Sequence, residues 1–193
     1  MRLDPTVTAM DLTFESSQFS PDVEAMLLRH GWTIAEAPAG LTLGALRTMG
    51  APFRGTRFFR EFAPDVFETP SVATALAYQP GFLPGSLNQL YPEASKLVEE
   101  FDRTAPSGTR AIIASAATYV WLLWQHAQRT GTFPLTGYYT WTADTSPEGQ
   151  LIVGVFGRDR PLVVAPHAKT GAGVGVMPIL LPSVSARTPT LGD

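Results

Sequence analysis

Residues 109–131, TRAIIASAATYVWLLWQHAQRTG, decide the expected fold, because they form the longest apolar run of the chain and carry two of its four tryptophans. The small and β-branched residues of 110–114 do not alternate with polar ones, which predicts a short strand buried on both faces. Ser115 then offers a side-chain oxygen to the first free N–H groups of a helix over 116–129. Gly131 is the expected left-handed residue that ends this helix.

The helix over 116–129 is apolar on most of its sides, so we expect other elements to cover it. One apolar stripe consists of Ala116, Val120, Leu123, Trp124 and Ala127. A helix of about 15 residues is too short for a bilayer, which needs about 20. The pattern therefore predicts a central buried helix.

The remaining elements separate by type along the chain. A first helix is expected to start at Ser20–Pro21, and a second is expected over 41–49. A third is expected to end at about Asp102 and to start either at Ser86 or near Pro92. Strands are expected over 6–14, 32–37, 56–62, 71–78, 138–142, 151–156, 161–165 and 174–181. Helices in the first two-thirds and strands in the last third predict an α+β fold, with a mostly antiparallel sheet packed against about four helices.

Length and composition bound the class of protein. A chain of 193 residues predicts a single globular domain over 1–182, followed by a flexible, small and polar C-terminal tail over 183–193. The absence of cysteine excludes disulfides, thiol catalysis and cysteine-ligated zinc. We expect a soluble, cytoplasmic and, from its arginine, alanine, glycine and proline content, bacterial protein, since the N-terminus lacks a signal-peptide pattern.

Charge and hydropathy bear on partners. A net charge of −3 with 16% charged residues argues against nucleic acid and against an anionic membrane surface. The 45% hydrophobic content favours a homo-oligomer or another protein partner, because interface cores are depleted in charge. The loop over 80–86, PGFLPGS, is expected to expose Phe82 and Leu83.

Ser115 is the first candidate catalytic residue, because a serine between a strand and a helix is where a hydrolase places its nucleophile. Asp144 or Asp159, followed by His167, would complete an acid and a base in the chain order of α/β-hydrolases. Positions 113 and 117 are not the glycines that the nucleophile motif requires. The alternative, a helix cap, is the ordinary role of serine there.

The histidines give weaker candidates. His126 follows Tyr119 by seven residues on the central helix, so the two could share a face for acid–base chemistry, or His126 could be a core histidine. His30 fits a helix C-terminus, and His167 has no evident role. No two histidines have a metal-ligand spacing, so we expect no metal site, and no cofactor is indicated.

Two further patterns could bind a ligand. Arg54, Arg57 and Arg60 alternate with phenylalanines and could bind an anion, or their stems could cover an aromatic layer. The glycines of 171–175, GAGVG, lack the helix and lysine of a phosphate loop and favour a flexible connection.

These observations favour a non-catalytic binding or protein-interaction domain, with a small molecule as one class of ligand. The alternative is a small hydrolase or isomerase that uses Ser115 or His126 in an aromatic pocket.

Overall fold

The computed structural model describes residues 18–38, 40–55, 74–167 and 172–183, which form an α+β fold, as predicted. Within these ranges the chain forms α1 (Pro21–Arg29), α2 (Leu43–Thr48), α5 (Tyr91–Thr104) and α6 (Ala116–Thr130), together with two sheets. The predicted strands over 6–14 and 56–62 lie outside the described residues, as does the C-terminal tail from residue 184 onward.

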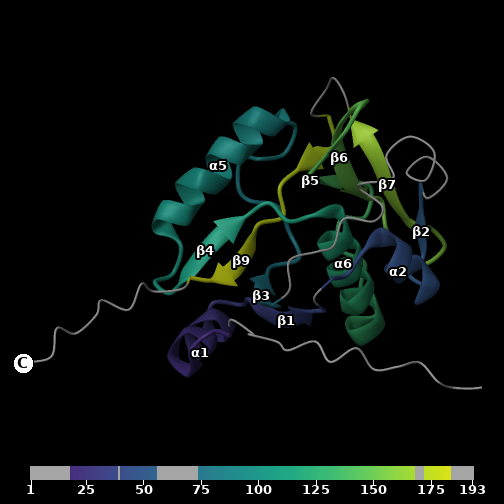
Figure 1. Cartoon of the computed structure of the whole chain (residues 1–193). Helices are drawn as coiled ribbons and strands as arrows, with labels where there is room; N and C mark the ends of the chain where they lie inside the picture. Colours follow the sequence, from purple (N-terminus) through teal and green to yellow (C-terminus); the bar gives the residue numbers. More distant parts are fainter. Residues whose placement is uncertain (1–17, 39, 56–73, 168–171, 184–193) are drawn as a thin grey trace, which may run out of the picture.

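The first sheet has the strand order β1-β3-β9-β4 and is antiparallel throughout. Its strands are β1 (Thr33–Ala37), β3 (Thr74–Tyr78), β9 (Ile179–Pro182) and β4 (Thr109–Ile112). Helix α5 lies along the outer side of β4, and α1 lies beside β1 (Figure 1). Ser183, the first residue of the predicted tail, donates its N–H to the carbonyl of Gly108.

The second sheet has the order β2-β7-β6-β5-β8. Its strands are β2 (Phe53–Arg54), β7 (Leu162–His167), β6 (Gly149–Gly154), β5 (Tyr139–Ser146) and β8 (Val174–Gly175). Strands β5, β6 and β7 form the predicted antiparallel meander, because short polar turns connect them. The two-residue strands β2 and β8 pair in parallel with β7 and β5.

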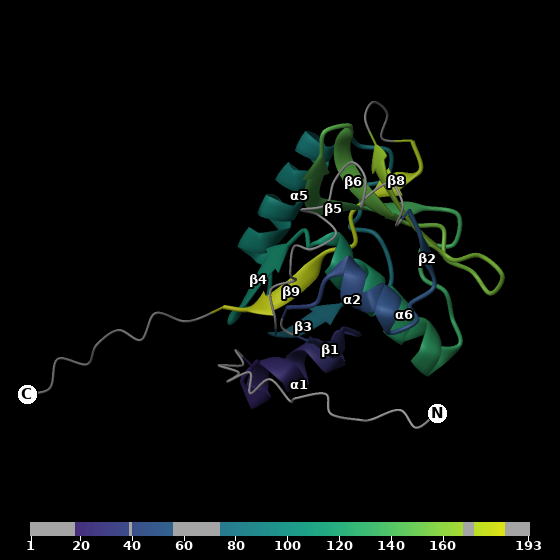
Figure 2. The same cartoon turned by 45° about the vertical axis from the view of Figure 1, so that its right-hand side comes forward.

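Helix α6 is the central buried element, as predicted. Ser115 caps its first turn and Gly131, with φ of 70°, ends it. Its buried side chains share one core cluster with residues of both sheets and of α2, which runs beside α6 (Figure 2). Trp121 and Trp124 are half-buried and pack edge to face against each other, with ring centroids 6.0 Å apart.

Two predictions about the segments around this core are wrong. The chain does not form one strand over 174–181: β8 ends in the second sheet and β9 begins in the first, with Pro178, which has no N–H to give a ladder, between them. Of the two predicted starts of helix α5, the one near Pro92 is confirmed, because the helix begins at Tyr91. Ser86 is buried and accepts the N–H of Val176 instead of capping the helix.

The loop over 80–86 does not expose its two apolar residues. Phe82 is half-buried and packs edge to face against Tyr138. Its ring lies so close to Gly175 that a Cβ at that position would overlap it. Leu83 packs in the cluster around Trp141. Both side chains therefore contribute to the core.

Candidate functional site

Ser115 acts as a helix cap. Its Oγ accepts the N–H of Thr118 at 3.2 Å and shares a second hydrogen bond with the Thr118 hydroxyl at 2.9 Å. The serine oxygen therefore accepts a hydrogen bond from one of the N–H groups that the start of a helix leaves without a backbone partner.

Tyr119 is fully buried and its hydroxyl has two backbone partners. It donates to the carbonyl of Met177 at 2.6 Å and accepts the N–H of Ala114 at 3.3 Å. Burial raises the pKa of this phenol above its ordinary value. Tyr119 thus holds the segment between the two sheets to the start of α6.

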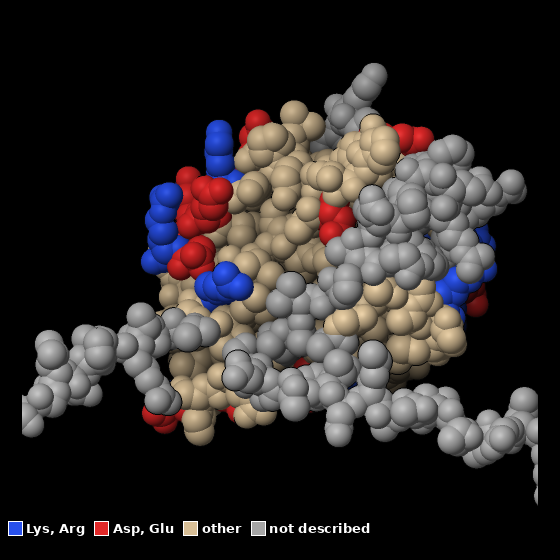
Figure 3. Space-filling view, viewed as in Figure 1, with Lys and Arg blue, Asp and Glu red and all other residues tan. Residues whose placement is uncertain are grey.

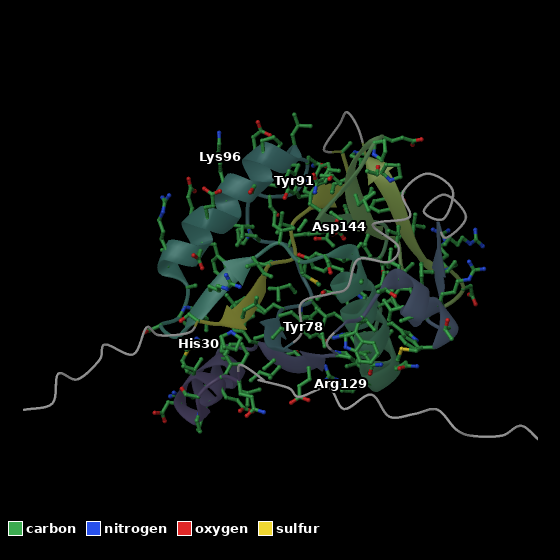
Figure 4. All side chains as sticks on the ribbon, in the orientation of Figure 1. His30, Tyr78, Tyr91, Lys96, Arg129 and Asp144 are labelled. Atoms are coloured by element: carbon green, nitrogen blue, oxygen red, sulfur yellow. The ribbon has the colours of Figure 1, made fainter. Side chains whose placement is uncertain are left out.

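His126 is buried and both of its ring nitrogens are engaged. Tyr78 Oη lies 2.9 Å from Nδ1, and Thr132 Oγ1 lies 2.9 Å from Nε2. Arg129 donates to the same Tyr78 oxygen at 3.2 Å (Figure 4 labels both residues). Desolvation, and then the charge of Arg129, lower the pKa of His126.

The donors and acceptors of this network fix the tautomer of His126. Thr130 donates its hydroxyl hydrogen to the carbonyl of His126 at 2.8 Å, so the hydrogen bond of 2.7 Å between Thr130 and Thr132 uses the hydrogen of Thr132. Thr132 therefore accepts from Nε2–H, which leaves Nδ1 to accept from the Tyr78 hydroxyl, whose oxygen also accepts from Arg129. Neutral His126 satisfies every member of the network, whereas a proton on Nδ1 would displace the donor of Tyr78.

His167 lies on β7, with its ring centroid 5.5 Å from that of Trp141 in an edge-to-face contact. Trp141 makes a second such contact with Tyr91 at 5.9 Å. Ser115 and His126 are eleven positions apart on one helix, or about 16 Å at 1.5 Å per residue. None of the four predicted catalytic residues lines either of the two clefts described below.

Asp144 is the acid that the sequence pattern placed between Ser115 and His167, and it reaches the start of α6. A β-bulge between Trp141 and Thr145 turns its carboxylate to accept the N–H of Ala116 at 2.6 Å. The amide of Gln150 fixes this bulge by donating to the carbonyls of Thr142 and Asp144.

The surroundings of Asp144 disfavour its charged form. Burial raises the pKa of its carboxyl, although the hydrogen bond from Ala116 opposes the shift. Burial and then the Asp144 charge raise the pKa of Tyr91 as well. The helix N-terminus that Asp144 caps offsets part of this cost.

A first cleft of about 250 Å³ separates α5 from β4. Its floor is apolar, formed by Val98 and residues 111–113, and its rim carries Tyr91, Ser95, Glu99 and Asp102. Asp102 accepts the N–H of Ala111 at 2.5 Å, so the helix supplies the acceptor that a neighbouring strand would otherwise give to this edge. Figure 3 shows acidic and basic side chains intermixed on this side of the molecule.

A second cleft of about 220 Å³ lies between the loop that contains Thr136 and Gly137 and the segment that connects β6 to β7. Its lining consists of Thr136, Gly137, Val155, Phe156, Gly157, Arg158, Asp159 and Arg160. Gly157 and Arg160 exchange two backbone hydrogen bonds, which places Arg158 and Asp159 at the tip of a tight turn. This cleft combines two guanidinium groups with an apolar wall.

Of the three arginines predicted as an anion site, Arg54 is exposed on β2, and Arg57 and Arg60 lie outside the described residues. Strand β2 pairs with the start of β7, just after the turn that carries Arg158 and Arg160. No pattern in the sequence had indicated Arg158 and Arg160 as ligand-binding residues. The signal that could have identified them is the short segment GRDR over 157–160, between the predicted strands over 151–156 and 161–165.

Within the described ranges no three histidine, aspartate or glutamate side chains gather in a way that could hold a metal ion. None of the helices placed in the structure has both the length and the apolar character needed to cross a bilayer. No family model matches the chain, and no curated protein or solved structure matches it either.

Proposed function

We propose that this protein is a non-catalytic binding domain. The observation that carries the proposal is that Ser115, Tyr119 and His126 each have their polar atoms committed to hydrogen bonds within the fold. A catalytic group needs an open position beside a reacting atom. These groups have partners from the fold instead and line neither cleft.

The clefts support binding in preference to chemistry. Each is open, smaller than the usual range of about 300–1,000 Å³ for pockets of drug-sized ligands, and lined by apolar side chains with a few charged groups at the rim. Such a surface suits a small ligand or a short portion of a partner.

Two measurements made together test this proposal. A serine-reactive fluorophosphonate should leave wild-type protein unlabelled, and a thermal-shift screen of small molecules should find ligands that raise its melting temperature. Ser115→Ala should keep the same ligands and lose only about 1 kcal/mol of stability, as the loss of a helix cap predicts. Labelling of the wild type that disappears in Ser115→Ala would overturn the proposal.

The Asp144 carboxyl favours a second candidate, a small hydrolase or isomerase. A carboxyl whose pKa is raised by burial, beside a serine at a helix N-terminus, is a combination found in acid–base sites. This candidate predicts turnover of a small ester or carbonyl substrate that Ser115→Ala and Asp144→Asn both abolish. The binding domain predicts that neither variant changes the background rate.

The proposed binding function includes a protein partner. The exposed large apolar residues belong to separate segments of the described chain: Leu28, Met49, Leu90 and Tyr138. We propose a homodimer in a reducing cytoplasm as the working assembly, since the chain has no cysteine. Sedimentation as a monomer at the highest workable concentration would rule out the dimer without affecting small-molecule binding.

A further inference from the structure

We infer that the cleft between Thr136 and the turn over 157–160 binds the oxyanion of a small ligand, a carboxylate or a phosphate, through Arg158 and Arg160. The inference rests on the proposed binding function and names the class of ligand and the site. It depends on three features of the cleft: fixed walls, two uncommitted cations and an apolar surface beside them.

The walls of the cleft are held in place by contacts between the two segments. The rings of Phe133 and Phe156 pack edge to face with centroids 5.0 Å apart. The Thr136 hydroxyl donates its one hydrogen chiefly to the carbonyl of Phe133 at 2.7 Å, and the carbonyl of Phe156, at 3.4 Å, is its second and weaker acceptor. The N–H of Val155 donates to the carbonyl of Tyr138 at 2.8 Å. A ligand would therefore meet a site already formed, which lowers the ordering cost of binding.

Val155 shows that the fold accepts backbone strain to build this wall. Its φ of 53° lies in the left-handed region, where a β-branched residue is a true outlier. Leu135, on the facing segment, has φ of 61°. Strained residues of this kind persist only where the surroundings enforce them, and they concentrate at ligand sites.

Arg158 and Arg160 are exposed and carry the charge of the cleft. Among the described residues neither forms an ion pair or a side-chain hydrogen bond. Their guanidinium groups stay protonated at any working pH and present planar forks of donors that match carboxylate and phosphate oxygens. The backbone N–H groups of Arg158 and Asp159, at the tip of the turn, likewise donate to no described residue.

Asp159 limits the charge that the cleft can accept. With two arginines and one aspartate in the lining, the net charge is +1, since 2 − 1 = 1. This favours a ligand of low charge over a polyanion. The side chains of Val155 and Phe156 supply a surface for its carbon frame. Figure 3 shows basic side chains at this edge of the molecule, over β2 and the start of β7.

Titrations of ¹⁵N-labelled protein with inorganic phosphate and with acetate, at low ionic strength, test the inference and separate the two sources of oxyanion. We expect amide shifts at residues 136–137 and 155–160. Arg158→Gln and Arg160→Gln should each raise the Kd about fivefold, as expected for an exposed charge pair. Asp159→Asn should lower it. The exposed Arg103→Gln on α5 is the matched control and should leave the Kd unchanged.

Shifts spread over the surface, or Kd values for Arg158→Gln and Arg160→Gln within twofold of that for Arg103→Gln, would overturn the inference. Absence of any shift with either anion would do the same. None of these results would contradict the proposed binding function if a ligand from the thermal-shift screen bound elsewhere on the protein and was recovered unchanged. The proposed binding function would be contradicted only if the protein converted that ligand into a product.

Discussion

Removing the Tyr78 hydroxyl tests the hydrogen-bond network around His126. In Tyr78→Phe the ring keeps its edge-to-face contact with His126, whose centroid lies 5.9 Å away, while Nδ1 loses its donor in a buried position. A buried acceptor left without a partner costs about 1–3 kcal/mol. Arg129 is exposed and regains its hydrogen bond from water, so it adds little. We expect a loss of about 2 kcal/mol.

Tyr138→Phe is the matched control because it deletes the same atom from a residue that is 44% exposed. We expect a change within about 0.5 kcal/mol there. Urea unfolding followed by tryptophan fluorescence measures both variants, provided that their m-values agree. If Tyr78→Phe and Tyr138→Phe are equally stable, the network does not hold the C-terminal half of α6 and the reasoning is wrong.

The same network predicts a dependence on pH. The pKa of His126 is lower in the folded protein than the ordinary value of about 6.5 in the unfolded chain, so below pH 6.5 the unfolded state binds more protons. The stability that neutral His126 gives is present above pH 6.5 and decreases as the pH falls toward the folded pKa. The slope cannot exceed about 1.4 kcal/mol per pH unit. The difference between wild type and His126→Asn should therefore shrink from pH 7 to pH 5, and a constant difference would contradict the assignment.

Three further substitutions test other parts of the structure by urea unfolding. Asp144→Asn should stabilise the protein more at pH 7 than at pH 4, because a raised folded pKa means that the ionised carboxyl weakens the native state as the pH rises; the opposite trend would make Asp144 a favourable cap. Gly154→Ala should cost about 3 kcal/mol or more, since a Cβ there would overlap the backbone of Tyr138 and Tyr139, whereas Gly81→Ala, with open space around it, should be near neutral. Val155→Gly should be at least about 1 kcal/mol less destabilising than Val163→Gly, because glycine relieves the left-handed backbone only at residue 155.

Local signals in the sequence were enough to predict the central helix. Ser115 and Gly131 mark its two ends, and the apolar stripe between them requires burial on most sides. The meander of β5, β6 and β7 could also be predicted from the sequence, because short polar turns leave consecutive strands few other ways to pair.

The division into two sheets could not be predicted, because it depends on contacts between distant segments. Residues 174–181 look like one strand with a proline in it, and only the positions of β5 and β4 show that its two ends belong to different sheets. The start of α5 was ambiguous for a similar reason. Ser86 is drawn away from a capping role by the N–H of Val176, which is 90 residues distant.

The candidate catalytic residues illustrate the same limit at the level of function. Sequence spacing placed Tyr119 and His126 on one helix but could not supply their partners, Met177 and Tyr78, which lie 58 and 48 residues away. The cleft at Arg158 and Arg160 was missed because its second wall comes from the loop at Thr136. A site made by two loops has no local pattern of its own.

The central claim is that this domain binds a ligand without transforming it. Its most direct test is to incubate wild-type protein with each ligand that raises its melting temperature and to follow the ligand by ¹H NMR until well beyond equilibration. The account predicts that every stabilising ligand is recovered chemically unchanged. A stabilising ligand that disappears with wild-type protein, but persists with Ser115→Ala or Asp144→Asn, would show that the protein is an enzyme.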